Sequence, residues 1–321
     1  MTSATITPDE VIGRIEHWNG KQVRWEVLGG GITNFNYVVT VSEGRGAAAG
    51  RTGEQGAALA GIERYVLRIP GEGTDTFIDR QRELNNHVAA AKTGVTPPVL
   101  HLIQPGHCTV VPFIHGETMH PETIAGHPDR LEKIVRAIRT YHDHAVFEHE
   151  IRVFEMIREY TAMARDVGAP RPVEYDHLYE LGAAIEVAMK RDQPSPTACH
   201  CDLLSENFIL DEDGKMWIID WEYGGTTDPY FDLGDFCVEH PLSAQEERDV
   251  LVWYCGEMNE PRYCRMMLYK LVADLWWSIW AMIQSRVSKI DFDFYEYGMN
   301  RIRRFCDNAA HPDYADWLAG V

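Results

Sequence analysis

The pattern of apolar and polar residues changes character near residue 113. Before this point, five short segments have the alternation or the apolar clustering of strands, and turn residues separate them. These segments are 22–28 (QVRWEVL), 34–41 (NFNYVVTV), 64–69 (RYVLRI), 99–103 (VLHLI) and 108–113 (CTVVPF). One segment with helical spacing, 76–94, ends at Gly94. We predict that residues 1–113 form an N-terminal five-stranded antiparallel sheet with one helix.

After residue 113 the apolar spacing becomes helical. Helices are predicted near 130–145, 150–166, 174–190, 244–258, 262–288 and 292–309. Two short strands, 207–211 (NFILD) and 216–220 (MWIID), interrupt this series. The whole pattern predicts an α+β, bilobal protein in which residues 114–321 form a larger, mostly helical domain.

Two N-terminal segments need separate interpretations. A short helix is expected to begin near Thr7 or Pro8. Residues 42–61 are rich in glycine and alanine and have no apolar period. They predict a flexible hairpin tip, whose role the sequence leaves open.

Composition and charge limit the possible partners. The formal net charge of −19 argues against binding to nucleic acid, which needs clustered lysine and arginine. The same field favours cationic ligands. We find no apolar run near the roughly 20 residues that span a bilayer, and no secretory signal pattern, so we expect no membrane partner. Seven scattered cysteines are typical of a reducing cytoplasm. The oligomeric state stays open.

The segment ACHCDLLSENFIL, residues 198–210, allows two interpretations. Its Cys-His-Cys run suggests zinc, but three consecutive residues cannot all point at one ion without severe backbone distortion. In the second interpretation, His200, Asp202 and Asn207 precede a strand hairpin whose second strand ends at Asp220. The hairpin places Asn207 beside Asp220, so a carboxylate base and hard oxygen ligands for Mg²⁺ converge. Phosphoryl transfer requires such a set.

These motifs resemble the choline/ethanolamine kinase family, a branch of the protein-kinase-like and aminoglycoside phosphotransferase superfamily. The similarity rests on HCDLLSENFIL, IIDWEYGGTTDPYFDLGDFCVEH and LWWSIWAMIQSRVSKIDFDFYEYG, and more weakly on GGGITNFNY. The resemblance implies a kinase that uses ATP and Mg²⁺ to phosphorylate a small cationic amino alcohol.

The resemblance also implies roles for individual residues. Asp202 would be the catalytic base or orient the substrate hydroxyl, His200 would brace the catalytic loop, and Asn207 and Asp220 would bind Mg²⁺. The first domain would bind ATP through a glycine-rich turn, an arginine on the third strand, its candidate glutamate partner, and a hinge that reads adenine. The residues concerned are Gly30, Gly31, Thr33, Asn34, Arg68, Glu83, Val111 and Phe113.

The acceptor site is expected near the C-terminus. Trp277 and Trp280 lie at i and i+3 of a predicted helix, and Tyr297 lies on the next. Aromatic residues at such spacing are often core residues, but the resemblance implies a pocket for a trimethylammonium group. Glu239 would complement its charge, and Glu222 is also assigned to this site. Asp235 and His240 stand where the family often has asparagine and an aromatic residue, so the amine stays open.

We therefore expect a cytoplasmic kinase that converts choline to phosphocholine. The alternatives are a kinase for ethanolamine or another amino alcohol, an aminoglycoside-type phosphotransferase, and a non-catalytic pseudokinase that only binds. The paired tryptophans argue against an aminoglycoside, and the presence of Asp202, Asn207 and Asp220 argues against a pseudokinase.

Overall fold

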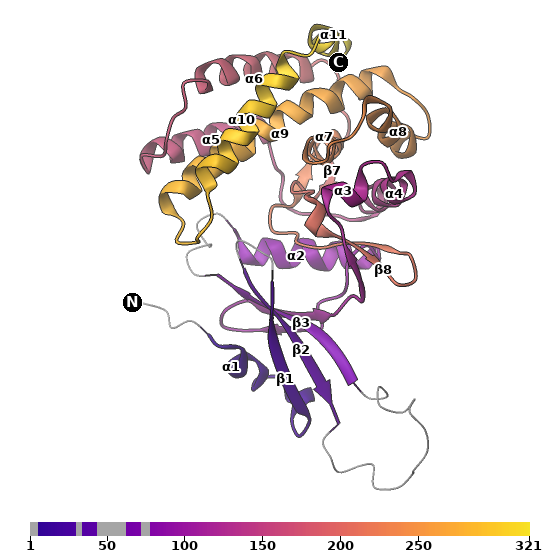
Figure 1. The fold of residues 1–321 in the computed structure, drawn as a ribbon, viewed down its shortest axis with the longest axis vertical. Coiled ribbons are helices and arrows are strands. Elements are labelled where there is room, and N and C mark those ends of the chain that lie inside the picture. The colour runs from indigo at the N-terminus through magenta and orange to yellow at the C-terminus, as the bar shows by residue number, and fades with distance from the viewer. Residues whose placement is uncertain (1–5, 30–33, 44–61, 72–77) are drawn as a thin grey trace. The chain divides into compact units, whose positions relative to one another are not determined.

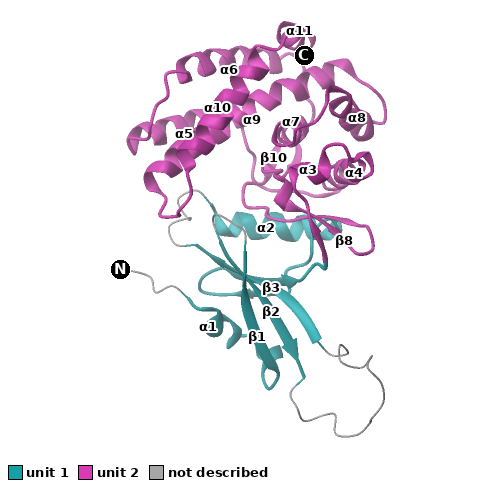
Figure 2. Cartoon of the chain, viewed as in Figure 1, with its two compact units in different colours: residues 1–115 teal, residues 116–321 magenta. Residues whose placement is uncertain are grey.

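The computed structural model describes residues 6–29, 34–43, 62–71 and 78–321. The chain divides into two compact units, Met1–His115 and Gly116–Val321 (Figure 2). This division falls two residues after the boundary expected from the sequence. The predicted hairpin tip lies outside the described residues over 44–61, as do Gly30, Gly31 and Thr33.

Unit 1 contains one five-stranded sheet. Its strands are β1 (Gln22–Leu28), β2 (Asn34–Ser42), β3 (Ile62–Pro70), β4 (His101–Ile103) and β5 (Cys108–Pro112). They follow the order β1-β2-β3-β5-β4, and every pairing is antiparallel (Figure 1). The predicted sheet is confirmed. Its strands could be predicted because successive side chains of a strand point to opposite faces of the sheet, which leaves an alternating pattern in the sequence.

The helices of unit 1 begin where side chains cap them. Thr7 and Glu10 form a capping box at the start of α1 (Pro8–Ile12). The Asp79 carboxylate accepts the Gln81 and Arg82 amides, both at 3.0 Å, and α2 (Arg80–Lys92) follows. A core forms between the sheet and the N-terminal segment that includes α1 and η1 (Glu16–Trp18). It contains Val11, Ile15, Trp18, Val39, Val41, Leu67, Ile69 and Val110.

Unit 2 is mostly helical. Its helices are α3 (Pro121–Ile124), α4 (Pro128–His144), α5 (Val153–Asp166), α6 (Tyr175–Met189), α7 (Pro229–Glu239), α8 (Ala244–Cys255), α9 (Glu260–Val287), α10 (Phe294–Ala309) and α11 (Tyr314–Gly320). A three-stranded sheet has the order β6 (Gly116–Thr118), β8 (Phe208–Asp211), β9 (Met216–Ile218). A two-stranded sheet joins β10 (Gly225–Thr227) to β7 (Thr197–Cys199). The short helix η3 (Ser205–Asn207) leads into β8.

Helix α9 is the centre of unit 2. It contacts α7 and α10 along much of its length (Figure 1). By length and composition it could cross a membrane, but the apolar window concerned is entirely buried inside the structure, so α9 is a core helix. It therefore carries Asp274, Trp277 and Trp280 into the interior of the unit.

Helix α7 was not expected from the sequence. All ten residues from Pro229 to Val238 are buried, so the segment has no polar face and no amphipathic period. The Asp228 carboxylate caps its start by accepting the Tyr230 amide at 3.0 Å. This helix holds Asp232, Asp235 and Glu239, and it positions the candidate active site. The short elements α3, α11, β6, β7 and β10 were also missed.

Candidate active site

Asp232 on α7 is the anchor of the candidate catalytic loop. Its two carboxylate oxygens accept the backbone N–H groups of His200 at 2.7 Å and Cys201 at 2.8 Å. The side chains of Tyr141 and His142, both from α4, also donate to Asp232. Burial alone would raise the pKa of Asp232, but these hydrogen bonds outweigh burial and lower it. Asp232 is therefore a buried, ionised carboxylate that fixes the loop backbone.

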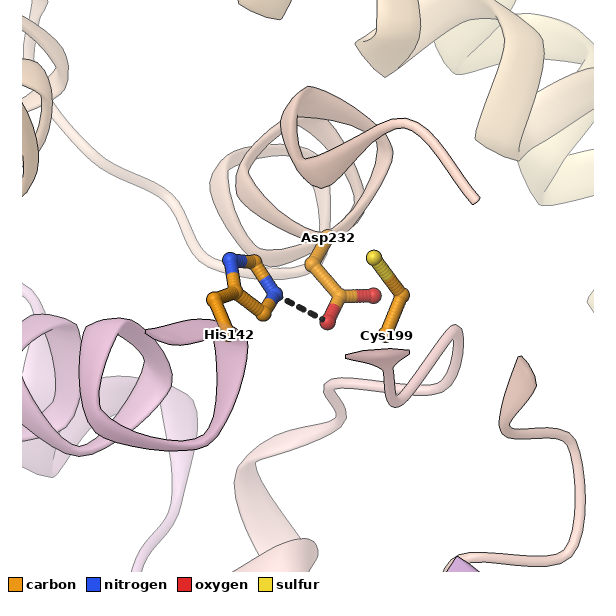
Figure 3. A group of neighbouring side chains, drawn as sticks. All are labelled: His142, Cys199 and Asp232. Carbon is orange, nitrogen blue, oxygen red and sulfur yellow. Dashed lines mark hydrogen bonds and ion pairs between the residues drawn. The ribbon is translucent and has the colours of Figure 1, made fainter. Parts of the chain in front are cut away.

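Figure 3 shows that His142, Cys199 and Asp232 lie close enough together to suggest a metal site. Their hydrogen bonds favour a structural role instead. Both ring nitrogens of His142 are in use, Nε2 with Asp232 at 3.0 Å and Nδ1 with the Tyr254 hydroxyl at 2.8 Å. Burial raises the pKa of the Cys199 thiol well above its ordinary value, which opposes the thiolate that a metal needs. We interpret this group as a hydrogen-bonded core.

His200 joins the loop to the strand that leads to Asp220. Its Nε2 donates to the Ile219 carbonyl at 2.9 Å, and its Nδ1 accepts the Asp202 amide at 3.3 Å. Burial lowers the pKa of this imidazole, so it stays neutral in this arrangement. The ring is thus placed to brace the loop, and it is not available for the zinc site that the Cys-His-Cys run suggested.

Asp202 lies among other carboxylates. Burial raises its pKa well above the ordinary value, and the nearby charges of Asp235, Asp220, Glu222 and Glu239 raise it further, in that order. A carboxylate with a raised pKa accepts a proton more readily than an ordinary aspartate. The structure therefore brings the predicted base together with Asp220, Glu222 and Glu239.

Asn207 and Asp220 are held at adjacent ends of the β8–β9 hairpin. The Ile219 amide donates to the Asn207 carbonyl at 2.9 Å, which joins the two segments. Asn207 Nδ2 donates to the Asp202 carbonyl at 2.8 Å, and this leaves Oδ1 as the amide atom suited to a metal ion. Asp220 has a left-handed backbone, with φ of 73°, a conformation that is strained for aspartate and common at functional sites. An amide oxygen and a carboxylate fit Mg²⁺, which prefers hard oxygen ligands.

Asp235 also holds the loop, because its Oδ2 accepts the Leu203 amide at 2.7 Å. It is fully buried, and its other oxygen has no hydrogen-bond partner among the described residues. Burial and the neighbouring Glu239 raise its pKa well above the ordinary value. Asp232 and Asp235, one helical turn apart, thus fix three of the four amides between His200 and Leu203.

Four aromatic rings form one group, which we term the aromatic cluster: Tyr223, Trp277, Trp280 and Tyr297. The ring centroids of Trp277 and Trp280 are 5.5 Å apart, and Trp280 lies 6.3 Å from Tyr297. Tyr223, which was not predicted, lies 4.9 Å from Trp277. Burial raises the pKa of both tyrosine hydroxyls, and the charge of Asp202 raises them further. The aromatic cluster is therefore within electrostatic range of the predicted base.

Glu239 does not present a free carboxylate to this cluster. Its Oε2 accepts from Arg301 at 2.7 Å and its Oε1 accepts from Arg304 at 2.6 Å. Arg304 also donates to Asp274 of α9. These partners were missed, although the i, i+4 spacing of Tyr297 and Arg301 places both on one face of α10.

The predicted nucleotide residues lie in unit 1. The expected ion pair between Arg68 and Glu83 is present at 3.0 Å, and Glu83 also accepts from Arg80 at 2.8 Å. Asn34 begins β2, opposite Pro70 of β3, and Val111 pairs with Val66 within the sheet. The Phe113 amide already donates to the Arg64 carbonyl at 3.1 Å, so this N–H is not free to read adenine.

Comparisons with known proteins agree with this arrangement. The family model described as choline/ethanolamine kinase matches residues 25–252. The mouse protein named Ethanolamine kinase 2 is 26% identical, over 94% of this chain and 83% of its own length. These two matches identify a family but leave its two acceptors, choline and ethanolamine, undistinguished.

Two crystal structures show the same fold. A choline/ethanolamine kinase family protein from Mesorhizobium loti has a TM-score of 0.80 and 30% identity, covering 97% of this chain and 96% of the other. Choline kinase LicA from Streptococcus pneumoniae has a TM-score of 0.73 and 22% identity, covering 94% and 98%. The chain therefore has a protein-kinase-like fold, belongs to the choline/ethanolamine kinase family and is a small-molecule kinase.

Proposed function

We propose that this protein transfers the γ-phosphoryl group of ATP to the hydroxyl oxygen of choline. The bond from the γ-phosphorus to the bridging oxygen breaks, a new bond to the choline oxygen forms, and the hydroxyl proton passes to Asp202. The products are phosphocholine and ADP. The observation that carries this proposal is the aromatic cluster near Asp202, together with Glu239, a glutamate that two arginines already bind.

Each residue then has a definite task. Asp202 orients the choline hydroxyl and accepts its proton, while Asp232 and Asp235 keep the loop backbone in place. Asn207 and Asp220 would hold Mg²⁺, which when bound offsets negative charge on the phosphates. Arg68, positioned by Glu83, would bind phosphate oxygens of ATP.

The aromatic cluster favours choline as the acceptor. A trimethylammonium group has no N–H to donate, and aromatic faces attract it through cation–π interactions. Ethanolamine remains the main alternative, and the name of the mouse relative supports it. An aminoglycoside would need many acidic contacts in place of these rings. A non-catalytic role is disfavoured because Asp202, Asn207 and Asp220 are all present.

We also propose that the protein acts in the cytoplasm. All seven cysteines lie in the part of the chain that the structure describes, and all are free thiols. Free thiols are typical of a reducing compartment.

A coupled ADP-release assay tests the proposed function. ATP and Mg²⁺ are supplied with choline, ethanolamine, dimethylethanolamine or kanamycin as the acceptor. We expect a strong preference for choline. Turnover of ethanolamine without choline would keep Asp202 as the base and reject the aromatic cluster as a trimethylammonium site. No turnover with any of the four would reject the proposed reaction.

Replacing Trp280 with leucine tests the aromatic cluster. The change keeps an apolar, though smaller, side chain and removes the π face, so KM for choline should rise about tenfold while KM for ATP stays near the wild-type value. Trp280→Phe keeps an aromatic face and should have a smaller effect. Both KM values are measured by ADP release, with thermal melting as the check on folding. Equal changes in the two KM values would mean that Trp280 is only a core residue.

A further inference from the structure

Arg301 of α10 makes two contacts that meet at the proposed acceptor site. Its guanidinium carbon lies 3.6 Å from the centroid of the Tyr297 ring, which is a close cation–π contact. Its NH2 group donates to Glu239 Oε2 at 2.7 Å. The Arg301 side chain is only 11% exposed and that of Glu239 only 7%, so the pair is part of the packed interior. A cation of the protein itself therefore occupies one face of a ring in the aromatic cluster.

The second oxygen of Glu239 is also occupied. Arg304 donates to Oε1 at 2.6 Å and is itself held by Asp274. Burial alone would raise the pKa of Glu239, but Arg301 and Arg304 outweigh burial and lower it, so the carboxylate is ionised and paired. Each oxygen of Glu239 thus already accepts from an arginine, which leaves this carboxylate with less negative charge and fewer acceptor positions for an incoming ammonium group.

This arrangement separates the two candidate amines. A primary ammonium group brings three N–H donors that need acceptors once water is removed, and an unmet donor is costly. A trimethylammonium group has no such donors and needs only aromatic faces and space. Other carboxyl groups also belong to this site: Glu222 is adjacent in sequence to Tyr223 of the aromatic cluster, and Asp235 is fully buried and tied to the loop through Leu203.

We infer that Arg301 is a specificity-determining residue, which keeps Glu239 from a primary ammonium group and so makes the site select a quaternary amine. This inference rests on the proposed function, because it concerns the acceptor of that reaction. The negative charge of Glu239 offsets the positive charge of Arg301. A cationic substrate can therefore approach the face of Tyr297 opposite Arg301 without strong repulsion. Removing Arg301 should release Oε2 of Glu239 as an acceptor for N–H donors.

The test compares Arg301→Met with Arg303→Met. Arg303 lies on the same helix but is exposed, and it contacts Glu296 and Asn300. The quantity measured is the ratio of kcat/KM for choline to kcat/KM for ethanolamine. We expect Arg301→Met to lower this ratio about tenfold, mainly through a lower KM for ethanolamine, which is about the effect of one hydrogen bond to a charged group. Arg303→Met should leave the ratio unchanged.

Each other outcome is decisive. An unchanged ratio of the two kcat/KM values in a folded Arg301→Met protein overturns the inference. A preference of the wild-type protein for ethanolamine also overturns it, but leaves the kinase assignment standing. If Arg301→Met does not fold, Arg301→Gln keeps a neutral donor to Glu239, and its ratio should fall by about threefold. If neither amine is phosphorylated, the proposed function fails, and calorimetric dissociation constants for choline and ethanolamine decide the role of Arg301.

Discussion

Replacing Asp202 with alanine is expected to lower kcat by about 10³-fold, within the range for loss of a general base. The change removes the group that orients the acceptor hydroxyl and takes its proton. The dissociation constant for ATP should stay near the wild-type value, because the predicted nucleotide residues Arg68 and Glu83 belong to unit 1. ADP release measures kcat, and calorimetric titration measures nucleotide binding.

Two further variants separate chemistry from folding. Asp213→Ala removes an exposed aspartate from the β8–β9 turn and should leave kcat unchanged. Asp202→Asn should lose activity but melt at a higher temperature than the wild type. We expect this higher melting temperature because burial and four nearby carboxylates raise the pKa of Asp202, so its ionised form is unfavourable in the folded protein. Asparagine is neutral and removes this cost. Wild-type kcat in Asp202→Ala would remove Asp202 from the mechanism.

Local patterns predicted much of the fold. The strand β1 was predicted with its observed limits, Gln22–Leu28, because apolar and polar residues alternate along it in the sequence, although most of its residues are exposed in the structure. Helices such as α4 and α10 have one apolar face, so the helical spacing of their apolar residues also predicted them from the sequence. Helix α7 was not, because it is buried on all sides and has no period to detect.

The sequence predicted the grouping of candidate-site residues only where these residues are close together along the chain. His200, Asp202 and Asn207 lie within one loop, and a single hairpin brings Asp220 to them. Glu239 forms ion pairs with Arg301 and Arg304, which lie 62 and 65 positions further along the chain. No local sequence pattern predicts contacts over such separations. The sequence therefore identified Glu239 but not that its charge is already balanced.

Helix α7 connects the two halves of the proposed chemistry. Asp232 and Asp235 hold the loop that carries Asp202, while Glu239, at the end of the same helix, holds Arg301 beside Tyr297. A shift of α7 would therefore move the base and the acceptor site together. We expect changes that loosen α7 to alter both kcat and the KM for the amine.

Replacing Asp232 with alanine should lower the free energy of unfolding by about 3–5 kcal/mol, the cost of breaking a buried charged network. The change removes one carboxylate and leaves buried donors from Tyr141, His142, His200 and Cys201 without their acceptor. Urea titration measures the free energy. Asp176→Ala, which removes a largely exposed aspartate paired with Arg171, should change it by less than about 1 kcal/mol.

The effect of Asp232→Ala should also depend on pH. Hydrogen bonds hold the folded-state pKa of Asp232 below its ordinary value of 3.8, so the folded protein binds this proton less tightly than the unfolded chain. The stabilisation is complete above that value and is lost as pH falls through the folded-state pKa. The difference in unfolding free energy between wild type and Asp232→Ala should therefore shrink below about pH 4. A difference that stays constant or grows on acidification would show that Asp232 is not an ionised anchor.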